Sequence, residues 1–375
     1  MSSQSFFAGL ACGAFVFGAC AAVAGPTFTN ERGGTVSYYG QFNPAYVSVD
    51  DGTSTTDNVA DSDLSNSRVG IRISEPYGDT MIGFRGEVAL GFALTSEYDQ
   101  LGRKSGAGSW ERTDIRFIDF TFEGSWGKLY LGQGSMFADG AAEISLGEAS
   151  GLIYQYTGDA NGFFQFRDSA GALSGIRVED TFGTFDGARR TRVRYDTPEL
   201  NGFTLGAAYG TNELSSDDDD TYADIGVYYD QEIANTQVSA GLAYQYRDRD
   251  AGGETTSWVA SGGVLLNNGL GFAAGYGTRD DSRDGRSDPS WAYIQATYDA
   301  NFWKAGTTGF GVDYYSGSDF ETDGSDSAAW GIGVIQNIDD YGIEVYLSYR
   351  EHSFEEPGTD YADLKSVLFG ARWRF

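Results

Sequence analysis

The chain has 375 residues, and its 54 acidic residues outnumber its 25 basic ones, which gives a formal net charge of −29. We exclude nucleic acid as a partner, because phosphate binding relies on clustered Lys and Arg. Aromatic residues make up 15% of the sequence, with 53 Gly and only 6 Pro. This composition is typical of many strands joined by tight turns, since aromatic side chains pack well on pleated sheets and Gly serves turns.

An uncharged apolar run, FFAGLACGAFVFGACAAVA, covers residues 6–24 and ends on Ala-Val-Ala. Signal peptidase reads this small-x-small pattern, so we predict that residues 1–24 are a cleaved signal peptide and that residues 25–375 form one exported domain. A retained membrane anchor and a lipoprotein signal at Cys20 are the alternatives. Both cysteines, Cys12 and Cys20, lie in this run, so the exported chain has no disulfide and no thiolate metal site.

Beyond residue 24, apolar residues alternate with polar or small ones over segments of about ten residues. In the last segment, one parity carries Val367, Phe369, Ala371, Trp373 and Phe375. The opposite parity carries Arg372 and Arg374. Ten residues in a strand tilted by about 45° cover about 23 Å, close to the apolar band of about 25 Å in outer-membrane barrels.

The connections between these segments are alternately short and long. PELNG (198–202) and EIANT (232–236) are short, whereas VDDGTSTTDNVADSD (49–63) and HSFEEPGTDYAD (352–363) are long and polar. Transmembrane barrels have short turns on one side and long loops on the other. The sequence therefore predicts an all-β, antiparallel transmembrane β-barrel of about 16 strands, from near Val36 to Phe375.

Two irregularities predict local breaks in the strands. In RTDIRFIDFTFE (112–123) the apolar parity changes between Phe117 and Ile118, which a β-bulge would explain. Pro44 lies within the first strand, and its missing N–H donor requires a bulge or a strand end.

One connection is much longer than the others. More than fifty residues lie between the strand that ends near Gln133 and the strand that begins near Thr191. Connections of this length are usually functional or disordered, and aromatic residues such as Tyr154, Phe163 and Phe166 argue against disorder. We predict that this loop is packed.

Four stretches carry a family resemblance: NSRVGIR (66–72), Gly124 with GKLYLGQ (127–133), RYDTPELNGF (194–203) and the terminal Phe375. Their order and spacing resemble the general trimeric porins of Gram-negative outer membranes, particularly the alphaproteobacterial ones. The resemblance covers nearly all of the chain beyond residue 24. It implies an outer-membrane homotrimer in contact with lipid and lipopolysaccharide, with the loop from Glu97 to Glu111 latching a neighbour.

The resemblance also implies roles for particular residues. The third long loop of these porins folds into the barrel and narrows it, with acidic groups that face a basic wall. By position, the acidic side would be Asp139, Glu143 and Glu148, and the basic wall Arg68, Arg72, Arg85, Arg192 and Arg194. Phe375 would be recognised by the outer-membrane assembly machinery, with Phe369 and Trp373 in the membrane girdle.

Independently of the resemblance, the positions of the arginines within the strands indicate that they face water inside the barrel. Each has the parity opposite to its apolar neighbours: Arg68, Arg72, Arg85, Arg192, Arg194, Arg372 and Arg374. An arginine that faces lipid near the midplane costs about 2 to 4 kcal/mol, but little when it faces water. Arg372 and Arg374 lie near the periplasmic rim, where reaching the headgroups is the alternative.

These observations predict a channel for passive diffusion of small hydrophilic solutes and ions. A solute-selective channel and a structural or adhesive barrel are the alternatives. We do not expect an enzyme, because the only histidine, His352, begins an extracellular loop and no serine or carboxylate is tied to it in sequence. The Asp217–Asp220 run could bind Ca²⁺ or be a solvated loop; we predict no other metal or cofactor.

Overall fold

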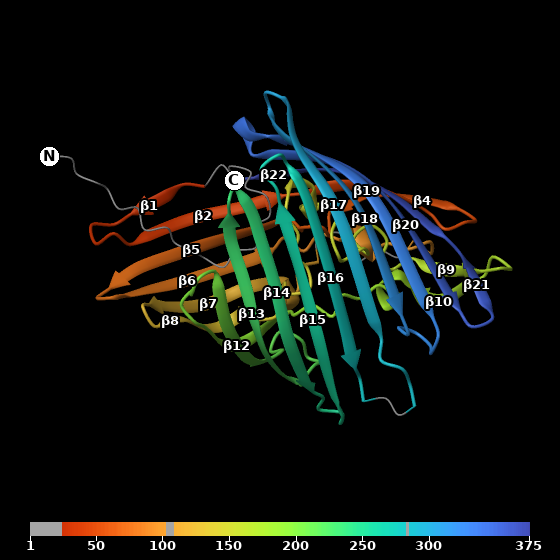
Figure 1. Cartoon of the computed structure of the whole chain (residues 1–375), viewed down its shortest axis with the longest axis horizontal. Coiled ribbons are helices and arrows are strands. Elements are labelled where there is room, and N and C mark those ends of the chain that lie inside the picture. Colours follow the sequence, from red (N-terminus) through yellow and green to blue (C-terminus); the bar gives the residue numbers. More distant parts are fainter. Residues whose placement is uncertain (1–24, 103–108, 283–284) are drawn as a thin grey trace.

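The computed structural model describes residues 25–102, 109–282 and 285–375, and strands dominate it (Figure 1). They form a closed antiparallel barrel of 16 spanning strands, which confirms the predicted fold class. The predicted signal peptide, residues 1–24, lies outside the described residues. Within the described residues, no helix has the length and apolarity needed to cross a membrane.

The strands follow one another around the barrel in chain order. Their segments are β2 (Thr35–Phe42), β3 (Pro44–Asp50), β4 (Thr55–Asp61), β5 (Arg68–Tyr77), β6 (Thr80–Ala89), β7 (Ile115–Gly124), β8 (Gly127–Ser135), β11 (Arg189–Asp196), β12 (Phe203–Thr211), β13 (Thr221–Ile233), β14 (Thr236–Asp248), β15 (Glu254–Leu265), β16 (Leu270–Asp280), β17 (Ser290–Trp303), β18 (Gly306–Ser318), β19 (Asp326–Ile338), β20 (Ile343–Glu356) and β22 (Leu364–Arg374). The first spanning strand consists of β2 and β3, and the second of β4 and β5.

The barrel closes where β22 meets the first strand. β22 pairs with β3 from Lys365 to Gly370, and Phe375 exchanges two backbone hydrogen bonds with Gly40 of β2, at 2.8 and 3.0 Å. A short strand, β1 (Thr27–Thr29), pairs with β2 beyond this point. No spanning strand is therefore left with a free edge at the closure.

Both predicted strand breaks are confirmed. The first strand is interrupted at Asn43, and β3 begins at Pro44. On β7, Ile115 pairs with Val88 and Phe117 pairs with Glu87, so Arg116 is the extra residue of a bulge. A bulge re-aims the side chains next to it, and here it lets both Arg116 and Phe117 point into the barrel.

Two of the predicted polar loops are wrong, because strands extend through them. Most of residues 49–63 form the β3–β4 hairpin, joined at residues 51–54. β20 continues through His352 to Glu356, and β21 (Thr359–Ala362) follows it. β4, the end of β20 and β21 lack an apolar parity, so a search for period-two alternation misses them. The Thr residues of β4 and β21 still favour strands.

Exposure alternates along the strands as the parity predicts. On β14 and β15, Leu242 and Trp258 are 45% and 52% exposed on the outer face, whereas Ala243 and Val259 are buried on the inner face. On β22, Phe369 and Trp373 point outward and are about half exposed. The outer face is therefore apolar, as contact with lipid requires.

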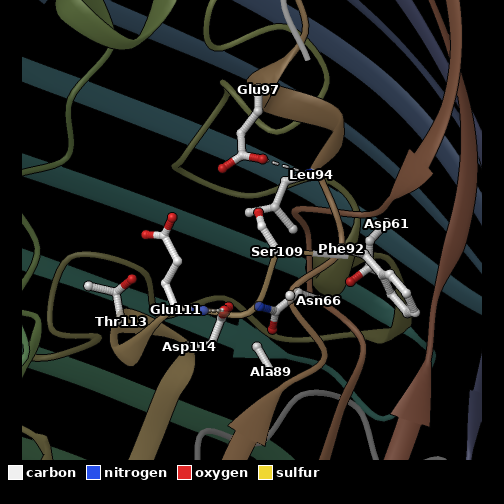
Figure 2. A pocket seen from close by; sticks show the side chains of 11 residues that line it. Asp61, Asn66, Ala89, Phe92, Leu94, Glu97, Ser109, Glu111, Thr113 and Asp114 are labelled. Carbon is white, nitrogen blue, oxygen red and sulfur yellow. Dashed lines mark hydrogen bonds between the residues drawn. The ribbon is translucent and has the colours of Figure 1, made fainter. Parts of the chain in front are cut away.

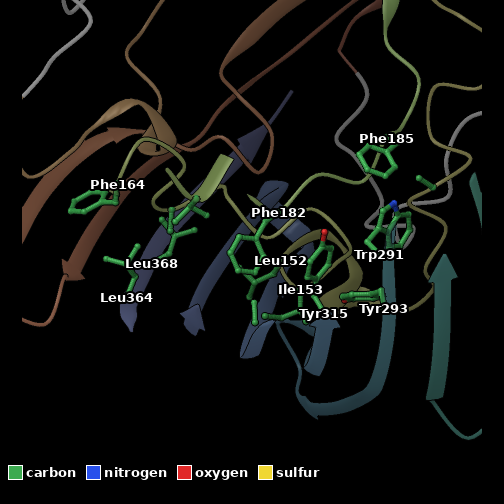
Figure 3. Close-up of a cluster of buried hydrophobic side chains, with 14 of the residues drawn as sticks. Leu152, Ile153, Phe164, Phe182, Phe185, Trp291, Tyr293, Tyr315, Leu364 and Leu368 are labelled. Carbon is green, nitrogen blue, oxygen red and sulfur yellow. The ribbon is translucent and has the colours of Figure 1, made fainter. Parts of the chain in front are cut away.

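Residues 136–188 fill one side of the barrel. They include η3 (Glu148–Gly151), the hairpin β9 (Gln165–Asp168) and β10 (Leu173–Arg177), and α1 (Val178–Thr181). Figure 3 shows loop side chains such as Ile153 and Phe182 against wall residues such as Tyr293 and Tyr315, all of them buried. The loop is thus packed, as predicted.

The same segment reaches the extracellular loops. β9 pairs with β21, and the guanidinium of Arg167 contacts the carboxylate of Asp51 at 2.8 Å. Phe166 is fully buried among the rings of Phe182, Phe354 and Tyr361. The long loop is therefore held both on the barrel wall and at the mouth.

Candidate functional site: the arginine wall and the inward loop

The inner face of the barrel has two different halves. On one half, Ser261 of β15 donates to the carbonyl of Ala141, and Tyr315 of β18 donates to the carbonyl of Gly183. These bonds fasten the loop to the wall from β15 to β20. On the other half, arginines from β5, β6, β7 and β11 lie on the wall. The arginines of β5, β6 and β7 thus lie away from the strands to which these bonds fasten the loop.

Glu87 is the centre of the charged half. Its side chain is 1% exposed and lies 2.7 Å from Arg85, 2.7 Å from Arg116 and 3.7 Å from Arg68. Tyr39 donates its hydroxyl to the same carboxylate at 2.7 Å. One negative charge therefore faces three guanidiniums, and a net positive charge remains on this part of the wall.

Aromatic rings separate the guanidiniums of this region. The Arg72 guanidinium carbon lies 4.1 Å from the centre of the Tyr39 ring, and that of Arg85 lies 3.5 Å from the centre of the Phe117 ring. The guanidinium carbon of Arg189 lies 5.8 Å from the centre of the same Phe117 ring. Arg72 is exposed to the interior of the barrel and has no carboxylate partner within the part of the chain that the structure describes.

Arg192 and Arg194 are paired with carboxylates of the wall. Arg192 lies 2.7 Å from Asp119, and both side chains are almost fully buried. Arg194 makes two bonds of 2.8 and 2.9 Å to Asp196. They also donate to the carbonyls of residues 132, 135 and 136, where β8 passes into the long loop. These two arginines therefore fix the start of the loop.

Arg372 and Arg374 share Glu344 of β20. The Arg372 Nε and the Arg374 guanidinium each lie 2.6 Å from its carboxylate, which is 3% exposed. Both arginines therefore turn to the inner face at the periplasmic end. A further pair that the sequence did not single out, Arg350 and Asp313, makes two bonds of 3.0 and 2.8 Å on the same face.

Two of the three predicted loop carboxylates lie together. Glu143 bonds to Thr184 and interacts electrostatically with Asp139 and with Arg189 of the wall. Burial, and then repulsion from Asp139, raises the pKa of Glu143 to about 7. The loop therefore carries an acidic group close to the arginine half of the wall.

A third carboxylate of this group was missed by the sequence analysis. Asp186 accepts hydrogen bonds from the backbone N–H groups of Gly140 and Ala142, at 2.5 and 2.8 Å. Burial, and then the charges of Glu143 and Asp139, raises the pKa of Asp186 well above its ordinary value. Asp186 thus ties the two ends of the loop together beside the predicted carboxylates.

Glu148 lies elsewhere. Its carboxylate accepts a hydrogen bond of 2.7 Å from Asn337 of β19, and its backbone N–H donates to Asp299 of β17 at 3.0 Å. Burial raises the pKa of Glu148. The structure therefore places Glu148 at the wall that the loop covers, apart from Asp139 and Glu143.

Sequence spacing could have identified two of the three residues that were missed on the wall. Arg85 and Glu87, like Arg194 and Asp196, are spaced by two, which puts both side chains on one face of a strand. That spacing was a usable signal for Glu87 and Asp196. No such signal existed for Arg116, since the bulge changes its parity.

His352 does not begin a loop, contrary to the sequence analysis. It lies in β20, fully buried, with Nε2 donating to the carbonyl of Thr157 at 3.1 Å and Nδ1 accepting from Asn161 at 3.2 Å. The ring of Phe182 meets it edge-on. His352 therefore anchors the long loop to the wall.

A pocket of about 160 Å³ lies at the extracellular end of the barrel (Figure 2). Its carboxylates are Asp61, Glu97, Glu111 and Asp114. Over residues 25–102, 109–282 and 285–375, no three His, Cys, Asp or Glu side chains are grouped so that they could hold a metal ion. In the acidic run Asp217–Asp220, the carboxylate of Asp218 accepts hydrogen bonds from Asn212 and Tyr222.

The connection from Glu97 to Glu111 begins inside its own barrel. Thr95 and Ser96 of η1 (Thr95–Glu97) are buried; Thr95 donates to the carbonyl of Asp159 at 2.6 Å, and Ser96 accepts from the N–H of Phe163 at 2.9 Å. Residues 103–108 of the predicted latch lie outside the described residues. The start of this connection is therefore held by the long loop of the same chain.

Residues 10–357 match the family model described as Gram-negative porin, whereas no curated protein matches the chain. Among solved structures, an anion-selective porin from Comamonas acidovorans is similar at 19% identity and a TM-score of 0.60, over 91% of this chain and all of that one. The trimer form of OmpT from Vibrio cholerae is similar at 16% identity and a TM-score of 0.59, over 91% of this chain and 99% of that one. OmpF of Salmonella typhi, in complex with daunomycin, is similar at 14% identity and a TM-score of 0.55, over 93% of this chain and all of that one. At these identities the likeness concerns the fold alone.

Proposed function

The chain belongs to the Gram-negative porin family, an outer-membrane channel family, and on that premise we propose that it forms a water-filled passage for passive diffusion of small hydrophilic solutes and ions. A barrel of 16 strands is wide enough to leave an aqueous channel. The alphaproteobacterial kinship and the signal peptide stay predictions.

The main support for a water-filled passage is the surplus of positive charge around Glu87. Arg68, Arg85 and Arg116 share its single buried carboxylate, and their own side chains are 20%, 31% and 18% exposed. Surplus charge of this kind is far less costly beside a water-filled passage than beside lipid. The loop carboxylates Asp139 and Glu143 provide the opposite pole. A passage between these poles orients polar solutes and disfavours apolar ones, which would displace ordered water.

The wall also favours anions beside Glu87. Arg192 and Arg194 each have a carboxylate of their own, and Arg372 and Arg374 share Glu344. The largest surplus of positive charge is therefore near Glu87, where three guanidiniums share one carboxylate. A structural relative, the porin from Comamonas acidovorans, is described as anion-selective. The same preference follows here from the unpaired guanidiniums, although the acidic outer loops oppose it.

The functional unit is a homotrimer in contact with lipid and lipopolysaccharide. OmpT of Vibrio cholerae occurs in a trimer form, and the outer face of this barrel is apolar around its circumference. Phe375, paired with Gly40 at the barrel seam, is the group offered to the assembly machinery. Phe369 and Trp373 belong to the girdle at the membrane surface.

A solute-selective channel is the second candidate, and one observation favours it. Guanidiniums and aromatic rings alternate along the wall at Arg72, Tyr39, Arg85 and Phe117. Rings and guanidiniums together can hold a planar or anionic solute. Conductance that saturates with one sugar or one organic anion would distinguish this function from free diffusion.

Purified protein in planar bilayers tests the proposal. We expect stepwise conductance that grows linearly with salt, and a reversal potential of anion sign in a KCl gradient. Folded, inserted protein that carries no current would refute the channel and leave a structural or adhesive barrel.

A further inference from the structure

Five side chains from five strands form one alternating stack on the inner wall. In order they are Arg72 of β5, Tyr39 of β2, Arg85 of β6, Phe117 of β7 and Arg189 of β11. The guanidinium carbons lie 4.1 and 5.9 Å from the centre of the Tyr39 ring, and 3.5 and 5.8 Å from the centre of the Phe117 ring. Each ring therefore has two guanidiniums within 6 Å of its centre.

The two rings offset the repulsion between neighbouring guanidiniums of the wall. Arg72, Arg85 and Arg189 repel one another. Within the described residues only Arg85 of the three forms an ion pair with a carboxylate, while Arg189 interacts electrostatically with Glu143. An aromatic face attracts a guanidinium: Arg72 lies close to the Tyr39 ring and Arg85 close to the Phe117 ring, and the Tyr39 hydroxyl also accepts from Arg85. Without the rings, these long side chains would spread into the water of the barrel.

The surroundings hold the rings in fixed places. The Tyr39 hydroxyl donates to Glu87 at 2.7 Å and accepts from Arg85 Nε at 3.0 Å. Phe117 is 8% exposed and follows the bulge at Arg116. Phe117 has the inward parity of Asp119, and the bulge turns Arg116 inward beside it.

We propose that Tyr39 and Phe117 are positioning residues of the channel: they fix the guanidiniums of Arg72, Arg85 and Arg189 beside the passage and so set its ion preference without carrying charge. This inference rests on the proposed channel function. It predicts that the ion preference depends on two uncharged rings as well as on the arginines themselves.

The test compares full-length variants in planar bilayers under a KCl gradient. Phe117→Leu and Tyr39→Leu remove a ring, and we expect each to lower the anion-to-cation permeability ratio about twofold and to increase open-channel noise. Phe117→Trp restores a ring and should restore the wild-type reversal potential. Phe120→Leu is the matched control, because Phe120 lies on the outer face of the same strand and is 50% exposed.

The outcomes separate this inference from the function on which it rests. Wild-type protein that carries no current refutes the channel. Wild-type current together with an unchanged reversal potential in Phe117→Leu refutes the positioning role alone; if that variant does not assemble, Tyr39→Leu decides the question in the same way. A shift that Phe117→Trp fails to restore also contradicts the proposal, since it would show that the ring itself is not what matters.

Discussion

Arg116 and Glu87 form an ion pair of 2.7 Å between β7 and β6, at the one position where β7 carries its bulge. Without the extra residue, the alternation of the strand would turn Arg116 to the lipid face. The bulge thus adds a third guanidinium to a carboxylate that Arg85 and Arg68 already contact. A local irregularity of the backbone thereby determines the charge of the wall.

Glu87→Gln should destabilise the barrel and strengthen its preference for anions. The variant leaves Arg68, Arg85 and Arg116 without their shared counter-charge, and breaking a buried ion pair costs about 3 kcal/mol or more. The free energy of unfolding in denaturant and the reversal potential measure the two effects. Glu232→Gln, at the exposed end of β13, is the control. A variant as stable as the wild type would show that the cluster is solvated.

Neutralising Arg68, Arg72 and Arg85 together, each to Gln, should shift permeability toward cations. We expect the anion-to-cation ratio to fall about threefold or more, since one charge at about 4 Å in water is worth about 1 kcal/mol. Arg32→Gln is the control: its side chain is 80% exposed and pairs with Glu75. An unchanged reversal potential in the triple variant would show that these side chains do not line the passage.

Side chains of a spanning strand point alternately to the lipid face and to the barrel interior. This alternation explains which strands could be predicted from the sequence. Phe369 and Arg372 lie three residues apart on β22, one outward toward lipid and the other inward, so the spanning part of each strand carries a readable pattern. β4 lacks an apolar parity, which is why a loop was predicted over residues 49–63. The alternation is therefore informative only where the two faces of a strand differ in polarity.

The partners of the arginines could not be predicted in the same way. Parity gives the face of a side chain but not the register between strands, and the pairing of Arg372 with Glu344 depends on that register. The position of Glu148 depends on the path of the loop across β17 and β19. Such contacts join residues far apart in the chain, and no local pattern encodes them.

The charge of the loop should change near neutral pH. Burial and Asp139 raise the pKa of Glu143 to about 7, so this carboxyl is neutral in mild acid and gains its charge as the pH rises through 7. We expect permeability to shift toward cations between about pH 6 and pH 8, as measured by reversal potentials. The shift should be smaller in Glu143→Gln and unchanged in Glu213→Gln, an exposed residue of an outer loop.

The raised pKa of Glu143 also determines whether the protein gains or loses stability as the pH rises. A carboxyl whose pKa is higher in the folded protein stabilises the fold fully below its unfolded pKa, and this contribution is lost as the pH rises through the folded value. Wild-type protein should therefore lose stability between about pH 5 and pH 8, while Glu143→Gln should lose less. Equal losses in both proteins would show that Asp186 or another group titrates instead.

His352→Leu should loosen the long loop without removing charge from the passage. The carbonyl of Thr157 and the amide of Asn161 would lose their buried partner, and such a loss costs about 1 to 3 kcal/mol. We expect a lower free energy of unfolding and more frequent transient closures in single-channel records, while the reversal potential stays close to that of the wild type. His352→Gln keeps a donor and an acceptor and should recover part of the stability. If His352→Leu instead shifted the reversal potential as strongly as the triple arginine variant, the histidine would act on the passage itself and the anchoring role would be wrong.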